Sequence, residues 1–252
     1  MIQGAYIDNN SYRDEWELYD VVFSFVNYYD SSLDPNALAV SGIFYTIPTA
    51  NDYVKTIFKR LFDVDFKTVG EPIYTDIITS GCTSPYAYCT DVCGSCGNHH
   101  RNRNNLANRC HNNLPRENNQ IAVVWASRFG QFCDSINGVH TLLNDNNISY
   151  AAVLNKNPVV NFYHISGRTA AETESLMSCI LLHEVAHIFG IEEVNENSSH
   201  EGEPGVQCVM EKVDEDGLLL LYNRTKNGGS PFCATCESDL MDYVADKYFE
   251  GN

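Results

Sequence analysis

Apolar residues recur along this chain with two different periods, which together predict a mixture of helices and strands. A return every three to four positions predicts a helix with one buried face, and a short run rich in β-branched and aromatic residues predicts a strand. The helical pattern occurs at residues 12–29, 50–62 and 236–249. The strand pattern occurs at residues 39–47, 72–79, 121–126, 148–154 and 159–165. Helices and strands in this order indicate an α/β (α+β) domain.

The most clearly delimited helix follows the last of these strands. The four residues from Thr169 to Glu172 have the form of a capping box, in which each end residue bonds the backbone N–H of the other. Gly190 suits the position just after a helix, because glycine readily adopts the left-handed conformation found there. We therefore expect one helix between Thr169 and Gly190.

Two stretches lack a regular pattern. Residues 81–119 hold Cys, Asn, Gly, His and Arg with almost no aliphatic residues, so they need crosslinks or metal to become ordered. We interpret them as a Cys-rich insertion that is pinned either by disulfides or by zinc. Residues 191–235 are expected to be loop-rich.

Length and charge narrow the classes of protein to which this chain can belong. The 252 residues are expected to form a single domain over residues 1–252. The 33 acidic and 16 basic residues give a formal net charge of -17, which excludes nucleic acid and anionic lipid as partners. No segment approaches the roughly 20 apolar residues of a membrane span. The acidic excess fits a solvated surface, basic substrates or calcium; residues 213–217 are acidic enough for calcium but lack full EF-hand spacing.

The cysteine content bears on the compartment. The chain has 10 Cys, a number that favours disulfides and hence an extracellular, secreted protein. The first residues show no secretory leader, so an intracellular location is the alternative. The C-x-x-C pairs Cys93/Cys96 and Cys233/Cys236 suit zinc as well as disulfides.

The helix after Thr169 contains a motif that carries chemistry, His183-Glu184-Val185-Ala186-His187. A spacing of four residues places both imidazoles on one helix face, where both can bind one Zn²⁺. Zinc lowers the pKa of a bound water to about 7, and Glu184 is placed to accept the proton as general base. The motif therefore predicts a zinc hydrolase with His183 and His187 as metal ligands and Glu184 as the catalytic residue.

Three features around this motif resemble the metzincin zinc peptidases, and most of all the archaemetzincins. They are Gly190 after the second His, the sequence Cys208-Val209-Met210, and the later pair Cys233-x-x-Cys236. The resemblance implies that Met210 forms a Met-turn, a hydrophobic base beneath the zinc.

The same resemblance implies a fold. It is a metzincin-like catalytic domain with a twisted mixed sheet and with backing and active-site helices. Residues 1–190 would be the upper subdomain, above a loop-rich lower subdomain at residues 191–252 that carries the Met-turn and the C-terminal helix. The strand at residues 148–154 would be the edge strand that pairs with an extended substrate.

The third zinc ligand has two candidates. Metzincins usually have His or Asp three residues after the Gly, and this chain has Glu193 there. If residues 192–199 are an insertion, His200 matches the third His of the family. His200 is favoured because imidazole is the commoner zinc ligand, and Glu193 is the alternative because a carboxylate also binds zinc.

A second, structural zinc is implied by the resemblance, because archaemetzincins hold one with four Cys. This chain keeps Cys208, Cys233 and Cys236 but has Glu201 in place of the remaining Cys. His200 would complete a Cys₃His site if Glu193 binds the catalytic metal. Otherwise Cys208 pairs with Cys233 or Cys236 as a disulfide; the alternatives are equally weighted.

Cys179 lies one helical turn before His183. A turn advances the helix by about 6 Å, which is too far to share the metal comfortably, so a buried thiol or a disulfide is expected.

Together these features predict a zinc-dependent endopeptidase with a peptide or protein substrate, assumed to be a monomer. One alternative is a zinc amidase or aminopeptidase with the same metal chemistry. The other is a Cys-rich binding module with a degenerate site, against which the intact Glu184 counts.

Overall fold

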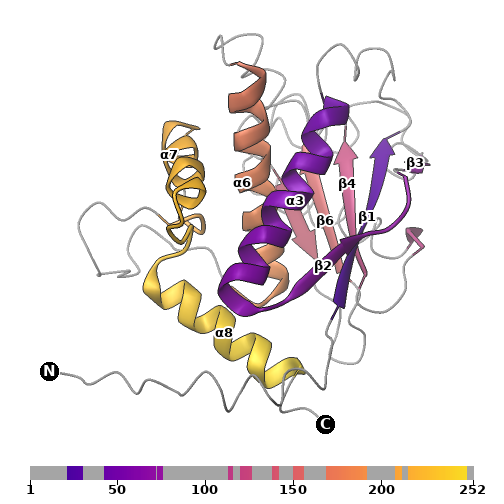
Figure 1. Cartoon of the computed structure of the whole chain (residues 1–252). Coiled ribbons are helices and arrows are strands. Elements are labelled where there is room, and N and C mark those ends of the chain that lie inside the picture. The colour runs from indigo at the N-terminus through magenta and orange to yellow at the C-terminus, as the bar shows by residue number, and fades with distance from the viewer. Residues whose placement is uncertain are drawn as a thin grey trace, which may run out of the picture.

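The computed structural model describes residues 22–30, 43–71, 73–75, 113–115, 120–126, 138–141, 150–155, 169–191, 208–211 and 215–248. These residues form a mixed β-sheet with helices packed on one of its faces (Figure 1), so the predicted α/β class is confirmed. None of the helices in these ranges combines the length and the apolar character needed to cross a membrane.

The sheet is 6-stranded and almost entirely parallel. Its strands are β1 (Val22–Asp30), β2 (Asp65–Thr68), β3 (Ile73–Thr75), β4 (Gln120–Ala126), β5 (Gly138–Thr141) and β6 (Tyr150–Asn155). The order is β2-β1-β4-β6-β5, and β3 pairs with β1 beside β2. Only β5 is antiparallel to its neighbour among the described strands.

The centre of the sheet confirms the predicted strand at residues 121–126. Every side chain from Ile121 to Trp125 is buried, as expected of a strand that lies between two parallel neighbours. The indole N–H of Trp125 donates a hydrogen bond to the Oδ1 of Asn27 at 3.1 Å, and both side chains are buried. This bond links β4 to β1 inside the core.

The predicted strand at residues 148–154 exists as β6, but its predicted place at the sheet edge is wrong. β6 lies between β4 and β5, and β5 is the last strand in the described order. The sequence Gly-Val-His-Thr of β5 is too short to show a strand period, so the outermost of the described strands could not be recognised from the sequence.

Two long helices lie side by side across the sheet, α3 (Ile43–Phe62) and α6 (Ala170–Ile188), as Figure 1 shows. Beyond them lie α7 (Glu215–Lys226), beside α6, and α8 (Ala234–Tyr248), across the lower ends of α3 and α6. The predicted helices at residues 50–62 and 236–249 are therefore confirmed as parts of α3 and α8.

A cluster of phenylalanines joins the sheet to the end of α6. The ring of Phe189 lies 5.1 Å from Phe23 and 5.0 Å from Phe58, centroid to centroid, and Phe66 stacks on Phe23 and Phe25 at 5.3 and 4.9 Å. Aromatic pairs at these distances contribute about 0.5–1.5 kcal/mol beyond the burial of their area. Because Phe189 directly follows α6, the cluster fixes this end of the helix against the sheet.

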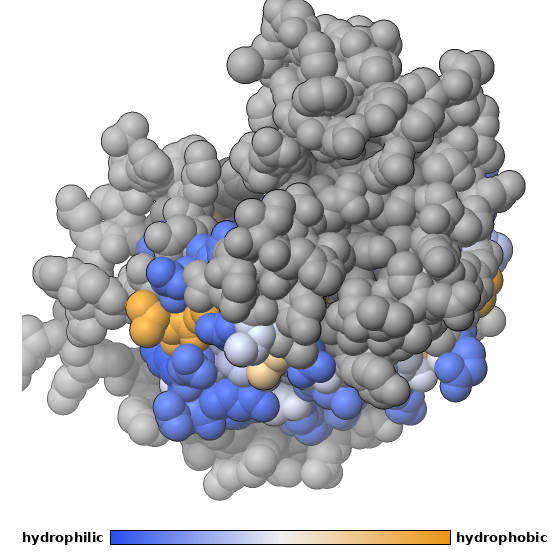
Figure 2. Space-filling view, turned by 90° about the horizontal axis from the view of Figure 1, so that it is seen from above, coloured by the Kyte–Doolittle hydropathy of each residue, from blue (hydrophilic) through white to orange (hydrophobic). Residues whose placement is uncertain are grey.

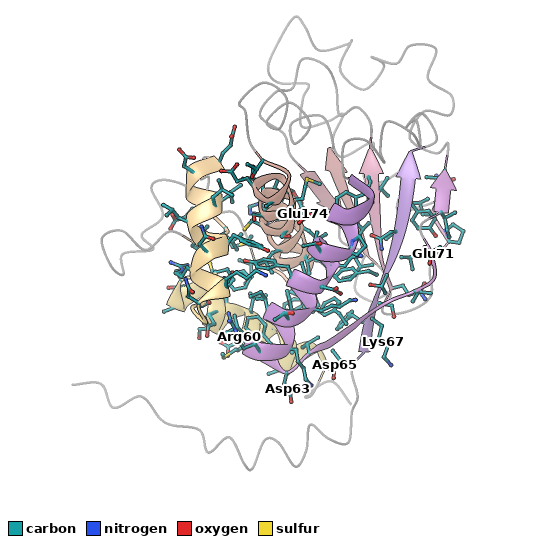
Figure 3. The ribbon with its side chains drawn as sticks, turned by 45° about the horizontal axis from the view of Figure 1, so that its top comes forward. Arg60, Asp63, Asp65, Lys67, Glu71 and Glu174 are labelled. Atoms are coloured by element: carbon teal, nitrogen blue, oxygen red, sulfur yellow. The ribbon has the colours of Figure 1, made fainter. Side chains whose placement is uncertain are left out.

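The turn between α3 and β2 contains two ion pairs, both made by Lys59. Asp63 adopts the left-handed conformation with φ 54, and Lys59 Nζ lies 2.6 Å from its carboxylate and 3.0 Å from that of Asp65. Asp63 and Asp65 lie close together at this turn in Figure 3. Hydrogen bonds to the two carboxylates raise the pKa of Lys59. The turn thereby directs the chain from α3 into the sheet.

Three sequence predictions are corrected. Residues 22–29 form strand β1 rather than the end of a helix; its side chains from Phe25 to Tyr28 are all buried, so both faces are covered and no clear period of two is visible. Residues 43–47 begin helix α3 rather than forming a strand, because propensity is a weak guide that tertiary context overrides, and here the helix runs on to Phe62. The region after Gly190 contains α7, which was missed because four consecutive leucines show no helical period.

The new helix also accounts for part of the candidate calcium loop. Glu215 and Asp216 lie in the first turn of α7, where negative charge is favourable beside the helix N-terminus. Gly217 is buried within the same helix. The acidic residues at 215 and 216 therefore belong to the start of a helix.

Several predictions fall outside the described residues. They are the start of the first predicted helix at residues 12–21, most of the Cys-rich insertion at 81–119, and the strand at 159–165. The strand predicted at residues 72–79 is described only as β3, at residues 73–75.

Part of the surface is visible in Figure 2, and its described residues are mostly hydrophilic. A hydrophobic patch interrupts this surface on the side where α7 lies. Leu220 of α7 has the most exposed large apolar side chain among the described residues, at 64%.

Candidate metal centre

Helix α6 begins where its capping box predicts. Thr169 is extended, with φ -75 and ψ 163, and its hydroxyl accepts a hydrogen bond from the N–H of Glu172 at 3.2 Å. The carboxylate of Glu172 accepts from the N–H of Thr169 at 2.7 Å. These reciprocal bonds satisfy two backbone donors that a helix start otherwise leaves unpaired.

The other end of α6 closes in a Schellman motif around Gly190. Its φ is 85, its N–H donates to the carbonyl of His187 at 3.0 Å, and the N–H of Ile191 donates to that of Ala186 at 3.3 Å. The predicted role of Gly190 after the helix is therefore confirmed. The turn brings the carbonyl of Ile191 back toward the last turn of α6.

The structure brings the two predicted zinc ligands together. The Nε2 atoms of His183 and His187 lie 3.0 Å apart, and the rings are nearly perpendicular, at 89°. The Nδ1 atom of His183 lies 2.7 Å from the carbonyl oxygen of Val209, and that of His187 lies 2.6 Å from the carbonyl oxygen of Ile191. Because a carbonyl only accepts, each Nδ1 carries a proton and donates it, which leaves the Nε2 atom of each ring to face the other ring.

This arrangement fits a zinc ion. Two nitrogens at about 2.0–2.1 Å from a tetrahedral zinc are separated by about 3.3 Å, close to the distance between these two Nε2 atoms. Two lone pairs that face each other repel, and a cation between them turns that repulsion into attraction. Metal-bound histidines also typically donate their other N–H to a carbonyl or carboxylate, as both rings do here.

Glu184 lies between the two histidines in the sequence and is 5% exposed. Burial of a carboxylate is costly unless a positive charge or hydrogen bonds compensate it. A metal held by the neighbouring imidazoles would supply such a charge.

A turn packs beside His183 at the sequence predicted to be the Met-turn. Cys208, Val209 and Met210 are at most 1% exposed, and the N–H of Glu211 donates to the carbonyl of Cys208 at 3.0 Å. The carbonyl of Val209 accepts the hydrogen bond from His183. The N–H of Val209 donates to the carbonyl of Pro231 at 2.9 Å, so the turn is bonded to the loop before α8.

Three cysteines from this turn and from the start of α8 form a second cluster. The sulfur atoms of Cys208, Cys233 and Cys236 all lie within 4.8 Å of one another. They are thiols, so the disulfide alternative for Cys208 receives no support from the structure. The Cys236 thiol donates to Cys208 and lowers the pKa of Cys208 to about 6, while the same bond raises the pKa of Cys236. A thiolate beside two further thiols is a donor set that zinc prefers.

Cys179 is a buried thiol, one of the two outcomes expected for it. Its S–H donates to the carbonyl of Leu218 at 3.5 Å, and burial raises its pKa to about 12. Tyr53 lies 4.0 Å from this sulfur and hydrogen-bonds the hydroxyl of Thr225 at 2.7 Å. These contacts join α6 to α3 and α7, so Cys179 has a packing role.

The two candidates for a third zinc ligand, Glu193 and His200, lie outside the described residues, as does Glu201. Sequence reasoning also missed several contributors to the site. The carbonyls of Val209 and Ile191 carry no side-chain signal, and Tyr243 of α8, which packs on Gly190, has no motif around it. Only the helix stop at Gly190 indicated that the chain turns back near the histidines.

The site and fold together define a mixed α/β protein with two convergent imidazoles on a helix that packs against the sheet. Among solved structures, the chain is similar in fold to archaemetzincin from Methanopyrus kandleri, with 12% sequence identity and a TM-score of 0.50 over 89% of this chain and 96% of that one. A zinc-dependent peptidase from Methanocorpusculum labreanum matches with 12% identity and a TM-score of 0.41 over 86% of this chain and 99% of that one. No model of a known protein family and no curated protein matches the sequence.

Proposed function

We propose that this protein is a zinc-dependent endopeptidase of the metzincin kind. The observation that carries the proposal is the pair of Nε2 atoms 3.0 Å apart, each on a ring whose Nδ1–H is bonded to a backbone carbonyl. This geometry presents two metal-directed lone pairs from adjacent helical turns. The similarity in fold to an archaemetzincin supports the same function.

Individual residues of this chain have separate roles in the proposed peptide hydrolysis. His183 and His187 would hold the zinc, which when bound lowers the pKa of water to about 7 and polarises the scissile carbonyl. Glu184, buried beside them, takes the proton of the attacking water and delivers it to the leaving amine. Met210, buried in the turn that accepts from His183, gives the site an apolar floor.

The edge of the sheet nearest this helix offers a place for an extended substrate. α6 packs against β5 and β6, and β5 is the last described strand on that side. A peptide can add to a sheet edge through main-chain hydrogen bonds. We therefore assign substrate pairing to β5 rather than to the strand at residues 148–154.

Purified protein tests this function directly. Zinc-loaded wild type should cleave internal bonds in a mixed peptide library, and Glu184→Gln should bind zinc but lose about 10²–10⁴-fold in rate, because the general base is removed. Cleavage confined to N-terminal residues would instead indicate an aminopeptidase, and cleavage of non-peptide amides alone an amidase. A zinc-loaded wild type that cleaves nothing would contradict the proposal and favour a binding module.

The third ligand is proposed to be His200, with Glu193 as the alternative. His200→Ala should lose zinc from the histidine site, and Glu193→Ala should retain it, because imidazole is the commoner ligand. The measurement is metal content together with peptide cleavage. Retained zinc and activity in His200→Ala would transfer the role to Glu193.

A second, structural zinc is proposed at Cys208, Cys233 and Cys236, whose sulfurs share a 4.8 Å cluster. His200 would complete this site if Glu193 holds the catalytic metal. Metal analysis should then find two zinc ions per chain, and Cys233→Ser should remove one of them while His183→Ala removes the other. One zinc in wild type that survives Cys233→Ser would contradict the second site.

A further inference from the structure

We infer that the segment at residues 231–243, the loop before α8 and most of that helix, positions both histidines of the metal centre, and that Tyr243 is the positioning residue for His187. The inference rests on the proposed zinc site. It assigns a role to a part of the chain that contributes no ligand to the histidine pair.

The orientation of His187 depends on the turn after α6. Its Nδ1–H donates to the carbonyl of Ile191 at 2.6 Å. Ile191 directly follows Gly190, whose left-handed φ of 85 sets the direction of the chain at that point. A change in the Gly190 backbone therefore moves the oxygen that holds the imidazole.

Tyr243 packs on Gly190 from α8. A Cβ atom added at Gly190 would lie 2.7 Å from Cδ2 and 2.9 Å from Cε2 of the Tyr243 ring, so the flat ring already occupies the space beside the glycine. The ring also meets Phe189 in an edge contact, at 6.3 Å between centroids and 77°. Tyr243 therefore lies against buried Phe189 and beside Gly190, which itself stays exposed to solvent.

The orientation of His183 depends on the same segment by another route. Its Nδ1–H donates to the carbonyl of Val209 at 2.7 Å, and the N–H of Val209 donates to the carbonyl of Pro231. Next to it, the N–H of Cys233 donates to the sulfur of Cys208 at 3.3 Å. The turn that accepts from His183 is therefore hydrogen-bonded at two points, Cys208 and Val209, to the loop that leads into α8.

The segment itself is firmly anchored. Leu240 and Cys236 of α8 are at most 2% exposed, and Phe232 is buried with its ring 6.2 Å from that of Phe62. Just before the segment, Arg60, labelled near the lower end of α3 in Figure 3, donates to the carbonyls of Thr225 at 3.2 Å and Gly229 at 2.7 Å, which ties the end of α7 and the chain after it to α3. A segment fixed to the core in this way can hold both carbonyls in place.

The test replaces the ring of Tyr243 and follows each histidine separately. Tyr243→Leu and Tyr243→Met keep an apolar side chain without a flat ring, Tyr243→Phe keeps the ring, and Met241→Ala alters an exposed residue of the same helix as the matched control. Zinc affinity of the histidine pair is measured by competition with a chelator, with His183→Ala as the reference for loss of that site. The imidazole N–H resonances of ¹⁵N-labelled histidine report on the two hydrogen bonds without reference to activity.

Tyr243→Leu should weaken zinc binding about 10-fold, the lower end of the range for groups that orient metal ligands. The N–H resonance of His187 should broaden through exchange with water while that of His183 remains. Tyr243→Phe and Met241→Ala should behave as wild type. Tyr243→Met should show the same losses if Tyr243→Leu does not fold.

Two results would overturn the inference while leaving the zinc site intact. One is unchanged zinc affinity and an unchanged His187 resonance in a folded Leu or Met variant. The other is a loss in Tyr243→Phe as large as in Tyr243→Leu, which would assign the effect to the hydroxyl. If the wild type binds no zinc, or if its zinc content is the same in His183→Ala, the proposed function and the inference are both overturned.

Discussion

His183 and His187 stand one turn apart on the same helix and make the same kind of hydrogen bond, but their acceptors come from very different places. The acceptor for His187 is the carbonyl of Ile191, 4 residues away in the sequence. The acceptor for His183 is the carbonyl of Val209, 26 residues away. One ligand is thus oriented by the end of its own helix, and the other by a turn that tertiary folding must bring to it.

The difference separates local from long-range support of a metal site. The Ile191 carbonyl moves with α6, and Tyr243 only braces the turn that carries it. The position of the Val209 carbonyl depends on the hydrogen bond from the Val209 N–H to the carbonyl of Pro231 and on the cysteine cluster. Changes at the helix end should therefore affect His187 first, and changes at the cysteines should affect His183 first.

Gly190→Ala should give the largest effect. A side chain at φ 85 is strained by about 1–3 kcal/mol, and its Cβ would overlap the Tyr243 ring, so the Ile191 carbonyl should shift. Zinc affinity should fall about 10–100-fold, measured by chelator competition, with stability followed by chemical denaturation.

Gly228→Ala is the matched control for this change. Gly228 has φ 90 and nothing lies within 4 Å of an added Cβ, so the variant has the backbone strain without the clash. It should lose stability and keep its zinc affinity. Equal loss of zinc in both variants would show that backbone strain anywhere in this part of the chain, rather than the turn beside His187, sets the affinity.

Cys236→Ser should give an intermediate effect, on the His183 side. It removes one member of the cluster that contains Cys208, the residue before Val209. The Val209 carbonyl should therefore be held less well, and the zinc affinity of the histidine pair should fall about 10-fold. The N–H resonance of His183 should broaden before that of His187. Cys179→Ala, which removes a buried thiol outside the cluster, should change neither; a His187 signal that broadens first would reverse the assignment.

The cysteine cluster also makes a prediction about pH. In wild type without metal, the hydrogen bond from Cys236 keeps the pKa of Cys208 at about 6, so its thiolate persists as the pH falls to about that value. A serine hydroxyl is a stronger donor than a thiol and would keep this hydrogen bond, whereas Cys236→Ala removes the donor, so the thiolate should protonate at higher pH in Cys236→Ala. Ultraviolet absorbance of the thiolate during a pH titration measures this shift, and an unchanged titration would assign the low pKa to the backbone donors instead.

Thr169→Ala should give the smallest effect on the metal site. Loss of the cap at the far end of α6 should lower the free energy of unfolding by about 1 kcal/mol. Zinc affinity should remain that of wild type, because neither carbonyl that holds a histidine lies near Thr169. A parallel loss of zinc would mean that affinity follows global stability rather than the two local supports.

The local half of the site could be predicted from the sequence. Glu172 after Thr169 marks the start of α6, Gly190 marks its end, and the spacing of His183 and His187 puts both on one face. These are relations within one helix, which short-range patterns determine. The apolar run at residues 121–126 predicted β4 for a similar reason.

The long-range half could not be predicted in the same way. The hydrogen bond from His183 ends on a backbone carbonyl, and Tyr243 packs on Gly190, a residue 53 positions earlier in the printed sequence (243 minus 190). Strand order raises the same difficulty: β5 precedes β6 in the chain but lies outside it in the sheet. Such relations depend on the assembled fold rather than on any stretch of sequence.

Trp125 offers an optical way to keep these effects apart. It is one of 2 tryptophans, is 1% exposed, and bonds Asn27 across two neighbouring strands of the sheet. An indole in an apolar core emits at shorter wavelength than one in water, so separation of β1 from β4 should shift its emission to the red. Because Trp125 lies in the sheet and not on α6, its fluorescence can report on unfolding while the histidines report on zinc.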